Sequence, residues 1–118
     1  MKLLGAMFSV VGREGNAWHV ALHPDHVIYG AHFPGHPVTP GVCILALLVE
    51  LLEQQQSRAL TLDEVKNLKF IAPISPVSDP QITVTFQKLD VEEDRLTTKG
   101  LIASNGRICT KFSLLLRL

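Results

Sequence analysis

Residues 39–56 read TPGVCILALLVELLEQQQ, and this stretch decides the fold. Its apolar part contains only two polar side chains, the thiol of Cys43 and the carboxylate of Glu50. Thr39 is expected to cap a helix that has Pro40 at its first position, where the N–H that proline lacks would have no partner. A helix that is apolar on every side cannot lie with one face in water. The sequence therefore predicts that the rest of the chain surrounds this helix.

Segments that favour β-strands flank the helix on both sides. Two strands are expected before it, joined by the turn residues Arg13-Glu14-Gly15-Asn16. Four are expected after it, the last two joined by Asn105-Gly106, the strongest two-residue hairpin signal. This order predicts one α+β domain over residues 1–118, a curved antiparallel sheet wrapped around one long hydrophobic helix. The expected strands are 3–11, 17–23, 64–72, 81–89, 95–104 and 107–118.

Residues 23–40 contain prolines, glycines and histidines at close intervals. We expect a loop without regular structure there, because proline and glycine interrupt both helices and strands. In the last strand, the alternation of apolar and polar residues predicts which side chains share one face. That face is expected to carry Ile108, Phe112, Leu114 and Leu116.

Composition narrows the class of protein. Hydrophobic residues make up 47% and charged residues 19% of the 118, which permits a packed core. Eleven basic and eleven acidic residues give no net charge, which disfavours a nucleic-acid partner. Two cysteines are too few for a disulfide framework, and we expect Cys43 to be a small buried hydrophobe. No apolar stretch is long enough to span a bilayer, so a cytoplasmic protein is expected.

The stretch Tyr-Gly-Ala-His-Phe-Pro-Gly-His-Pro-Val-Thr-Pro-Gly-Val at residues 29–42 carries the chemistry. It resembles the signature of the small 3-hydroxyacyl-ACP dehydratases, the FabZ- and FabA-like hotdog proteins: His-Phe-Pro-Gly-His-Pro, two residues, then Pro-Gly-Val. The segment NLKFIAP at residues 67–73 is also similar to that family. The resemblance implies a hotdog fold and an acyl-ACP or acyl-CoA thioester as substrate. It also implies a homodimer or dimer-based oligomer whose sheets join edge to edge, with acyl tunnels at the interface.

Water elimination from a 3-hydroxyacyl thioester requires a base, a group that polarises the carbonyl, and an acid for the departing hydroxyl. His32 matches the catalytic histidine of the family, and an imidazole pKa of about 6.5 suits a base near neutral pH. Gly41 and Val42 match the carbonyl-binding backbone, at a helix end with unpaired N–H groups and a positive dipole. The remaining motif residues expected to bind substrate are Phe33, Gly35 and Pro40.

The acid is where this sequence departs from the family. The family places Glu or Asp fourteen positions after the catalytic histidine, and here that position holds Ala46, which has no proton to donate. Glu50 lies one helical turn further on the same face, about 6 Å along the axis. We expect Glu50 either to substitute as the acid or to lie where the helix emerges into solvent.

Three functions stay open at this point. The leading hypothesis is a 3-hydroxyacyl thioester dehydratase of fatty-acid or lipid biosynthesis, with His32 and Glu50 as catalytic residues. Ala46 favours a first alternative, a non-catalytic acyl-thioester-binding protein or a silent subunit that pairs with an active homologue. The second alternative is an acyl thioesterase, which other hotdog proteins are, typically with a carboxylate that activates water. No carboxylate occupies the expected helix position for that activity.

Other polar residues are expected to have ordinary roles. His32 and His36 have the spacing of a metal-ligand pair on a helix, but Pro34 and Gly35 exclude that helix. We therefore expect no metal and no cofactor, and His36 is expected to brace the loop.

Basic residues are scattered along the second half of the chain and are expected to be ordinary surface charges. An acidic carrier protein would meet some of them, but their positions in the sequence define no patch. The residues concerned are Lys66, Lys69, Lys88 and Arg107.

Overall fold

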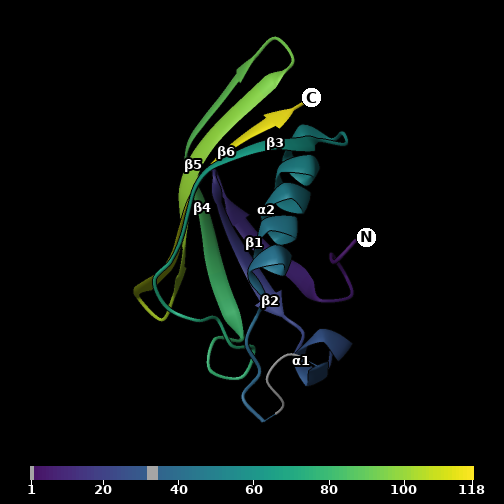
Figure 1. Ribbon diagram of the computed structural model, residues 1–118, viewed down its shortest axis with the longest axis vertical. Coiled ribbons are helices and arrows are strands. Elements are labelled where there is room, and N and C mark those ends of the chain that lie inside the picture. The colour runs from purple at the N-terminus through teal and green to yellow at the C-terminus, as the bar shows by residue number, and fades with distance from the viewer. Residues whose placement is uncertain (1, 32–34) are drawn as a thin grey trace.

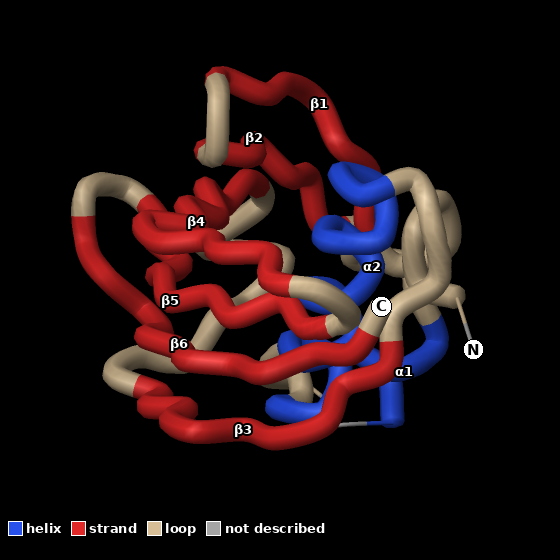
Figure 2. Tube along the Cα trace, turned by 90° about the horizontal axis from the view of Figure 1, so that it is seen from above, coloured by secondary structure: helices blue, strands red, loops and turns tan. Residues whose placement is uncertain are grey.

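A six-stranded antiparallel sheet curls around one long helix in the computed structural model, which describes residues 2–31 and 35–118 (Figure 1). The strand order is β1-β2-β4-β5-β6-β3, so β1 and β3 form the two edges. Viewed from above, the sheet forms an arc with the helix on its concave side (Figure 2). The elements are β1 (Phe8–Glu14), β2 (Ala17–Leu22), α1 (Val27–Ala31), α2 (Gly41–Gln56), β3 (Thr61–Phe70), β4 (Gln81–Glu92), β5 (Arg95–Ser104) and β6 (Arg107–Arg117).

Helix α2 supplies the centre of the core, as the sequence predicted. Leu47, Leu48, Leu51 and Leu52 are each at most 1% exposed and pack with the inward side chains of the sheet. One side of the helix is less covered: Val42 is 73% exposed, and Leu45, Ala46 and Val49 are only partly buried. The expectation that this chain alone surrounds the helix is therefore wrong for that side.

The hairpin between β5 and β6 confirms the Asn105-Gly106 turn. Both residues have positive φ, 51° and 77°, as a tight two-residue hairpin turn requires. The register then shifts, because Ala103 pairs with Ile108 while Ile102 pairs with Thr110. The extra residue turns Ile108 outward, where it is 40% exposed, so its expected place on the inner face is wrong.

Two segments before α2 differ from the sequence-based expectation, and after it β3 begins and ends earlier than expected and β4 ends later. The first strand begins at Phe8 rather than residue 3, because the chain turns at Gly5, which has a φ of 89°, and places Leu3 and Met7 in the core. The expected loop 23–40 contains the short helix α1. This helix forms between the interrupting prolines, and the Ile28 N–H donates to the His26 ring at 3.2 Å.

A buried carboxylate fastens the segment between β3 and β4 to the β5–β6 hairpin. Asp79 is 1% exposed and accepts hydrogen bonds from Ser104 Oγ at 2.6 Å, Arg107 Nη2 at 3.0 Å and the Ser75 N–H at 3.1 Å. Burial alone would raise the pKa of Asp79, but the bonds from Ser104 and Ser75 and the charge of Arg107 outweigh burial and hold this pKa below its usual value. The ionised carboxylate therefore stabilises this junction.

Asp79→Asn keeps the shape of the side chain and removes its charge. We expect it to lower the free energy of unfolding at pH 7 by about 1–3 kcal/mol. Because the pKa of Asp79 is lower in the folded chain, its contribution is fully present above the unfolded value of about 3.9 and is lost as pH falls through the folded value. The difference between variant and natural protein should therefore shrink below about pH 4, as measured by urea unfolding at several pH values.

Asp63→Asn is the matched control, because Asp63 accepts a 3.1 Å bond from Arg117 in an exposed ion pair. Its loss should be below about 1 kcal/mol. Equal losses in the two variants would contradict the role given to Asp79.

Candidate functional site

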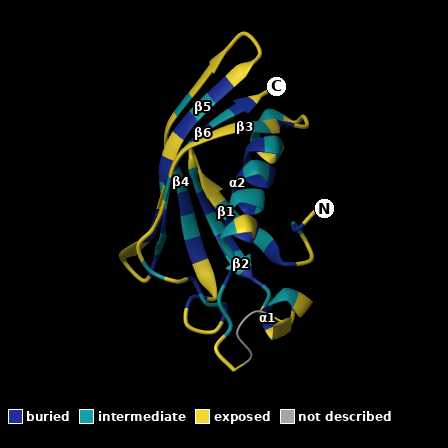
Figure 3. Ribbon diagram, in the orientation of Figure 1, coloured by how far each residue is buried: buried dark blue, intermediate teal, exposed yellow. Residues whose placement is uncertain are grey.

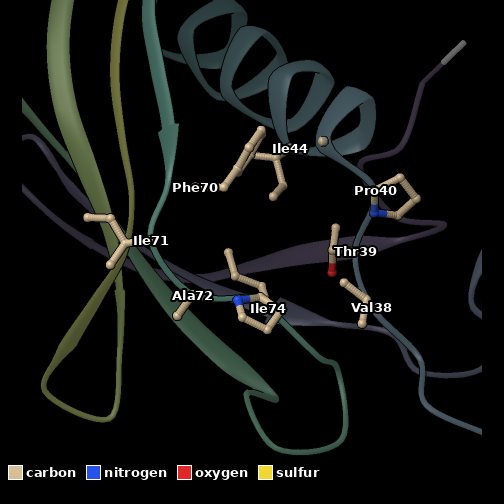
Figure 4. A pocket seen from close by; sticks show the side chains of 10 residues that line it. Val38, Thr39, Pro40, Ile44, Phe70, Ile71, Ala72 and Ile74 are labelled. Atoms are coloured by element: carbon tan, nitrogen blue, oxygen red, sulfur yellow. The ribbon is translucent and has the colours of Figure 1, made fainter. Parts of the chain in front are cut away.

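An apolar cavity of about 350 Å³ lies between the start of α2 and the segment that follows β3 (Figure 4). Its walls come from the two parts of the sequence that resemble the dehydratases, which the fold brings face to face. Thr39 contributes the only side-chain hydroxyl among the described lining residues. These residues are Val38, Thr39, Pro40, Gly41 and Ile44 on one side and Phe70, Ile71, Ala72, Pro73 and Ile74 on the other.

The first turn of α2 meets this cavity at Gly41. Pro40 is the N-cap residue, and its carbonyl accepts the N–H groups of Cys43 and Ile44 at 3.0 and 3.1 Å. The N–H groups of Gly41 and Val42 have no partner within the described part of the chain. Two unpaired donors at the positive end of a helix can stabilise a developing oxyanion.

Thr39 does not cap the helix, so that expectation is wrong. Its Oγ1 lies 3.0 Å from the hydroxyl of Tyr29, and its N–H donates to the Ile74 carbonyl at 2.8 Å. Burial raises the pKa of Tyr29, so the phenol stays neutral at physiological pH. Tyr29 and Thr39 thus join α1 to both walls of the cavity, a role that the sequence did not indicate because no local pattern links the two hydroxyls.

The missing side chain of Gly41 makes room for an aromatic ring. A Cβ at this position would lie 2.9 Å from Cζ of Phe70, the last residue of β3. Phe70 is 50% exposed, so its ring covers the first turn of α2 without being locked in the core. The resemblance implies that the backbone of Gly41 binds a carbonyl, and the structure places the Phe70 ring beside that backbone.

Glu50 is buried and holds the N-terminal segment. It is 7% exposed, and its carboxylate accepts the Leu3 N–H at 2.8 and 3.0 Å and the Leu4 N–H at 3.0 Å. The expectation that the helix emerges into solvent at Glu50 is therefore wrong. Glu50 is not among the residues that line the cavity. Ala46, one turn earlier, is partly buried against the core.

The other predicted site residues lie in different places. His32 and Phe33 lie outside the described residues. Gly35 has a φ of 87°, which favours glycine, and lines a neighbouring hollow with His36. That hollow shares Val38 and Pro73 with the cavity.

Other chemistry at the site is limited. Cys43 is buried as expected, and burial raises the pKa of its thiol, which disfavours a reactive thiolate. Within residues 2–31 and 35–118 no three His, Cys, Asp or Glu side chains are grouped as a metal site requires. No helix of the described chain has the length and hydropathy needed to cross a membrane.

Comparisons with known proteins found dehydratase relatives. The family model for ApeI-like proteins, described as ApeI dehydratase, matches residues 12–107. The 3-hydroxyacyl-[acyl-carrier-protein] dehydratase FabZ of Latilactobacillus sakei is 32% identical over 95 residues, 73% of this chain and 66% of the relative. The match thus spans slightly less than two thirds of that relative.

Solved structures share the hotdog fold at low sequence identity. The dehydratase heterocomplex ApeI:P of Xenorhabdus doucetiae superposes with a TM-score of 0.64 at 16% identity, over 92% of this chain and 96% of that one. A thioesterase of Haemophilus influenzae superposes with a TM-score of 0.66 at 13% identity, over 95% of this chain and 78% of that one. The fold is thus common to proteins named for either activity.

Gly41→Ala tests whether Phe70 occupies the space over the first turn. The added methyl group would meet the ring at 2.9 Å, and we expect a loss of about 1–3 kcal/mol in the free energy of unfolding. Adding Gly41→Ala to Phe70→Ala should cost much less than adding it to the natural chain, a coupling that urea unfolding of the four proteins measures.

Gly30→Ala is the control, because a Cβ there would meet nothing within 4 Å. It should leave stability unchanged or slightly raised. If the stability losses of Gly41→Ala and Phe70→Ala simply add in the double variant, the ring does not press on this turn.

Proposed function

Because the chain belongs to the ApeI-like dehydratase family, we propose that it binds a 3-hydroxyacyl thioester, carried on ACP or CoA, as a dehydratase-type subunit. The reaction is the reversible elimination of water in cytoplasmic fatty-acid or lipid synthesis. One observation carries the proposal: Gly41 lines an apolar cavity at a helix start where, among the described residues, the N–H groups of Gly41 and Val42 have no partner. An acyl chain needs the first feature and a thioester carbonyl the second.

In this proposal the acyl chain lies in the cavity, with the thioester carbonyl oxygen at the N–H groups of Gly41 and Val42. The positive end of α2 then stabilises the charge that develops on this oxygen when His32 removes a proton from C2. The electron pair of the broken C–H bond forms the C2=C3 double bond, the C3–O bond breaks, and the hydroxyl leaves as water after receiving a proton. The ring of Phe70 bounds the space at the carbonyl.

The proton for the departing hydroxyl is the missing component. Ala46 cannot supply it, and both oxygens of Glu50 are occupied by backbone N–H groups of the N-terminal segment. A catalytic role for Glu50 would require release of Leu3 and Leu4 from the carboxylate. We therefore propose that Glu50 is an anchor and that α2 of this chain provides no acid of its own.

The second candidate function follows from Ala46, which stands where the family has an acid. A subunit with a thioester site but no acid can act as the partner of a homologous subunit that provides one. The related complex from Xenorhabdus doucetiae is named a dehydratase heterocomplex, which supports this proposal. Thioester hydrolysis is less supported, because no carboxylate lines the cavity within the described residues.

An exposed sheet edge supports assembly with a second subunit. Most of edge strand β3 is exposed, in contrast to the inner residues of β4 and β5 (Figure 3). The poorly covered Val42 and the half-exposed Phe70 and Ile71 lie at the start of α2 and the end of β3. An unpaired edge and exposed apolar groups favour association, so we propose that two sheets join along β3 in a dimer.

Hydration of crotonyl-CoA and crotonyl-ACP, followed at the enoyl absorbance, tests the proposed reaction. We expect little activity from the natural chain alone and a gain of about 10²-fold or more in Ala46→Glu, since a positioned acid contributes that much. Adding His32→Ala to this variant should remove the gain, because the base is then missing.

Ala46→Gln is the matched control, because it fills the same space without an acidic proton. A gain in Ala46→Gln equal to that in Ala46→Glu would contradict the missing-acid proposal. Failure of crotonyl thioesters to bind any of these variants would contradict the function itself.

Glu50→Gln distinguishes an anchor from an acid. The amide retains one acceptor but turns an NH₂ group toward backbone donors, so we expect a loss of about 1–3 kcal/mol in the free energy of unfolding. The hydration activity of the folded Ala46→Glu protein should change less than about threefold when Glu50→Gln is added. An anchoring Glu50 takes no part in the proton transfers of either protein. Loss of activity without loss of stability would instead identify Glu50 as an acid.

A further inference from the structure

Five of the six lysines lie together on the outer face of the sheet, away from α2. Lys99 and Lys111 alternate along their strands with buried residues, and the strand register brings positions far apart in the sequence side by side. We call this surface the lysine face. It consists of Lys66, Lys69, Lys88, Lys99 and Lys111.

Two pairs of these lysines stand directly opposite each other on neighbouring strands. Lys88 pairs with Lys99 between β4 and β5, and Lys69 pairs with Lys111 between β3 and β6. Like charges in such positions destabilise a sheet. The same β4–β5 hairpin places Glu92 opposite Arg95, the arrangement that stability favours. The lysine pairs are therefore not explained by the folding of the sheet.

The ammonium groups also lack acidic partners within the described part of the chain. Among the described residues, none of the five lies within the 4.0 Å of a carboxylate that would make an ion pair. Lys66, Lys88 and Lys99 surround a hollow of about 190 Å³ that Ser113 also lines. Asp90 borders the hollow without forming an ion pair. This surface is thus open to carboxylates or phosphates of another molecule.

The extent of the lysine face limits what kind of molecule fits. Glu92 and Glu93 lie at the tip of the β4–β5 hairpin and, with Asp90 and Lys66, line the adjoining hollow. A membrane surface or an extended nucleic acid would meet these carboxylates as well as the lysines. A small protein with one acidic face can cover the lysines and leave the tip free.

The lysine face borders the proposed thioester site. Lys69 and Phe70 are consecutive at the end of β3, and successive residues of a strand point to opposite faces. Phe70 and the following Ile71 line the cavity, while Lys69 belongs to the lysine face. A flexible arm can therefore pass the end of β3 from one surface to the other.

We propose that an acidic carrier protein docks on the lysine face and delivers its thioester past the end of β3 into the cavity. This inference rests on the proposed function, because only a carrier-bound thioester requires a docking surface next to its cavity. Carboxylates of the carrier lie against Lys66, Lys88 and Lys99, and Lys69 and Lys111 guide the arm.

Binding of a fluorescently labelled acyl carrier protein to the full chain, followed by anisotropy at several salt concentrations, tests the docking surface. The carrier is used without its prosthetic arm and with a crotonyl arm. The triple variant Lys66→Glu/Lys88→Glu/Lys99→Glu should bind both forms about tenfold more weakly or worse, and the salt dependence should decrease. Its melting temperature should stay close to that of the natural chain, because the cross-strand pair at positions 88 and 99 exchanges one like-charge repulsion for another.

The double variant Lys2→Glu/Arg58→Glu is the matched control, because it reverses two exposed charges away from the lysine face. It should bind the carrier as the natural chain does. The triple Lys→Gln variant should show an intermediate loss, which separates loss of attraction from new repulsion. Unchanged carrier binding in the triple Glu variant would overturn the proposal.

Crotonyl-pantetheine is a neutral thioester, so its binding measures the cavity independently of the lysine face. It should bind natural and triple-Glu proteins equally. If it fails to bind while the arm-free carrier binds through the lysines, the proposed function fails and the docking surface stands. Binding of phosphatidylglycerol vesicles or single-stranded DNA that is stronger than carrier binding and is lost in the triple Glu variant would overturn the carrier assignment.

Discussion

Burial of one apolar helix is the constraint on which the rest of this structure depends. A helix the length of α2 is marginal by itself in water, and its stability comes from packing. Leu47, Leu48, Leu51 and Leu52 are almost completely removed from solvent, and each such side chain contributes about 1.5–3 kcal/mol. A sheet can cover such a helix only by curling around it, so the shape of the sheet follows from the helix. The carboxylate of Glu50 adds the N-terminal segment to this cover.

The position of the site follows from where this helix begins. The helix starts at the end of the sheet where β3 leaves it, and Pro40 leaves the first N–H groups of α2 without a side-chain cap. The segment held by Asp79 forms the opposite wall of the cavity. Gly41 permits the two walls to approach, since any larger residue would meet the ring of Phe70. The residues that pack the start of α2 against the end of β3 are therefore also those of the proposed thioester site.

Much of the fold was predictable, because strand alternation, Asn105-Gly106 and the apolar helix are local signals. Other features depend on distant partners. Ile108 turns outward because a bulge shifts its register with β5, which no pattern within β6 reveals. The dehydratase motif likewise predicted a site at the start of α2, where the structure has an apolar cavity. It did not show that Glu50 is occupied by the N-terminal backbone, because those contacts join residues 46 and 47 positions apart.

The sequence by itself determined the α+β fold around an apolar helix, the dehydratase-like loop before that helix, and alanine where an acid is usual. These features depend on residue types at short spacing, where period and turn chemistry act directly. Only the tertiary structure decided that Glu50 is an anchor in the fold, that Phe70 covers Gly41, and that scattered lysines share one surface. The physical reason is that strand register and helix packing bring together residues whose separation in the chain carries no information about their contact.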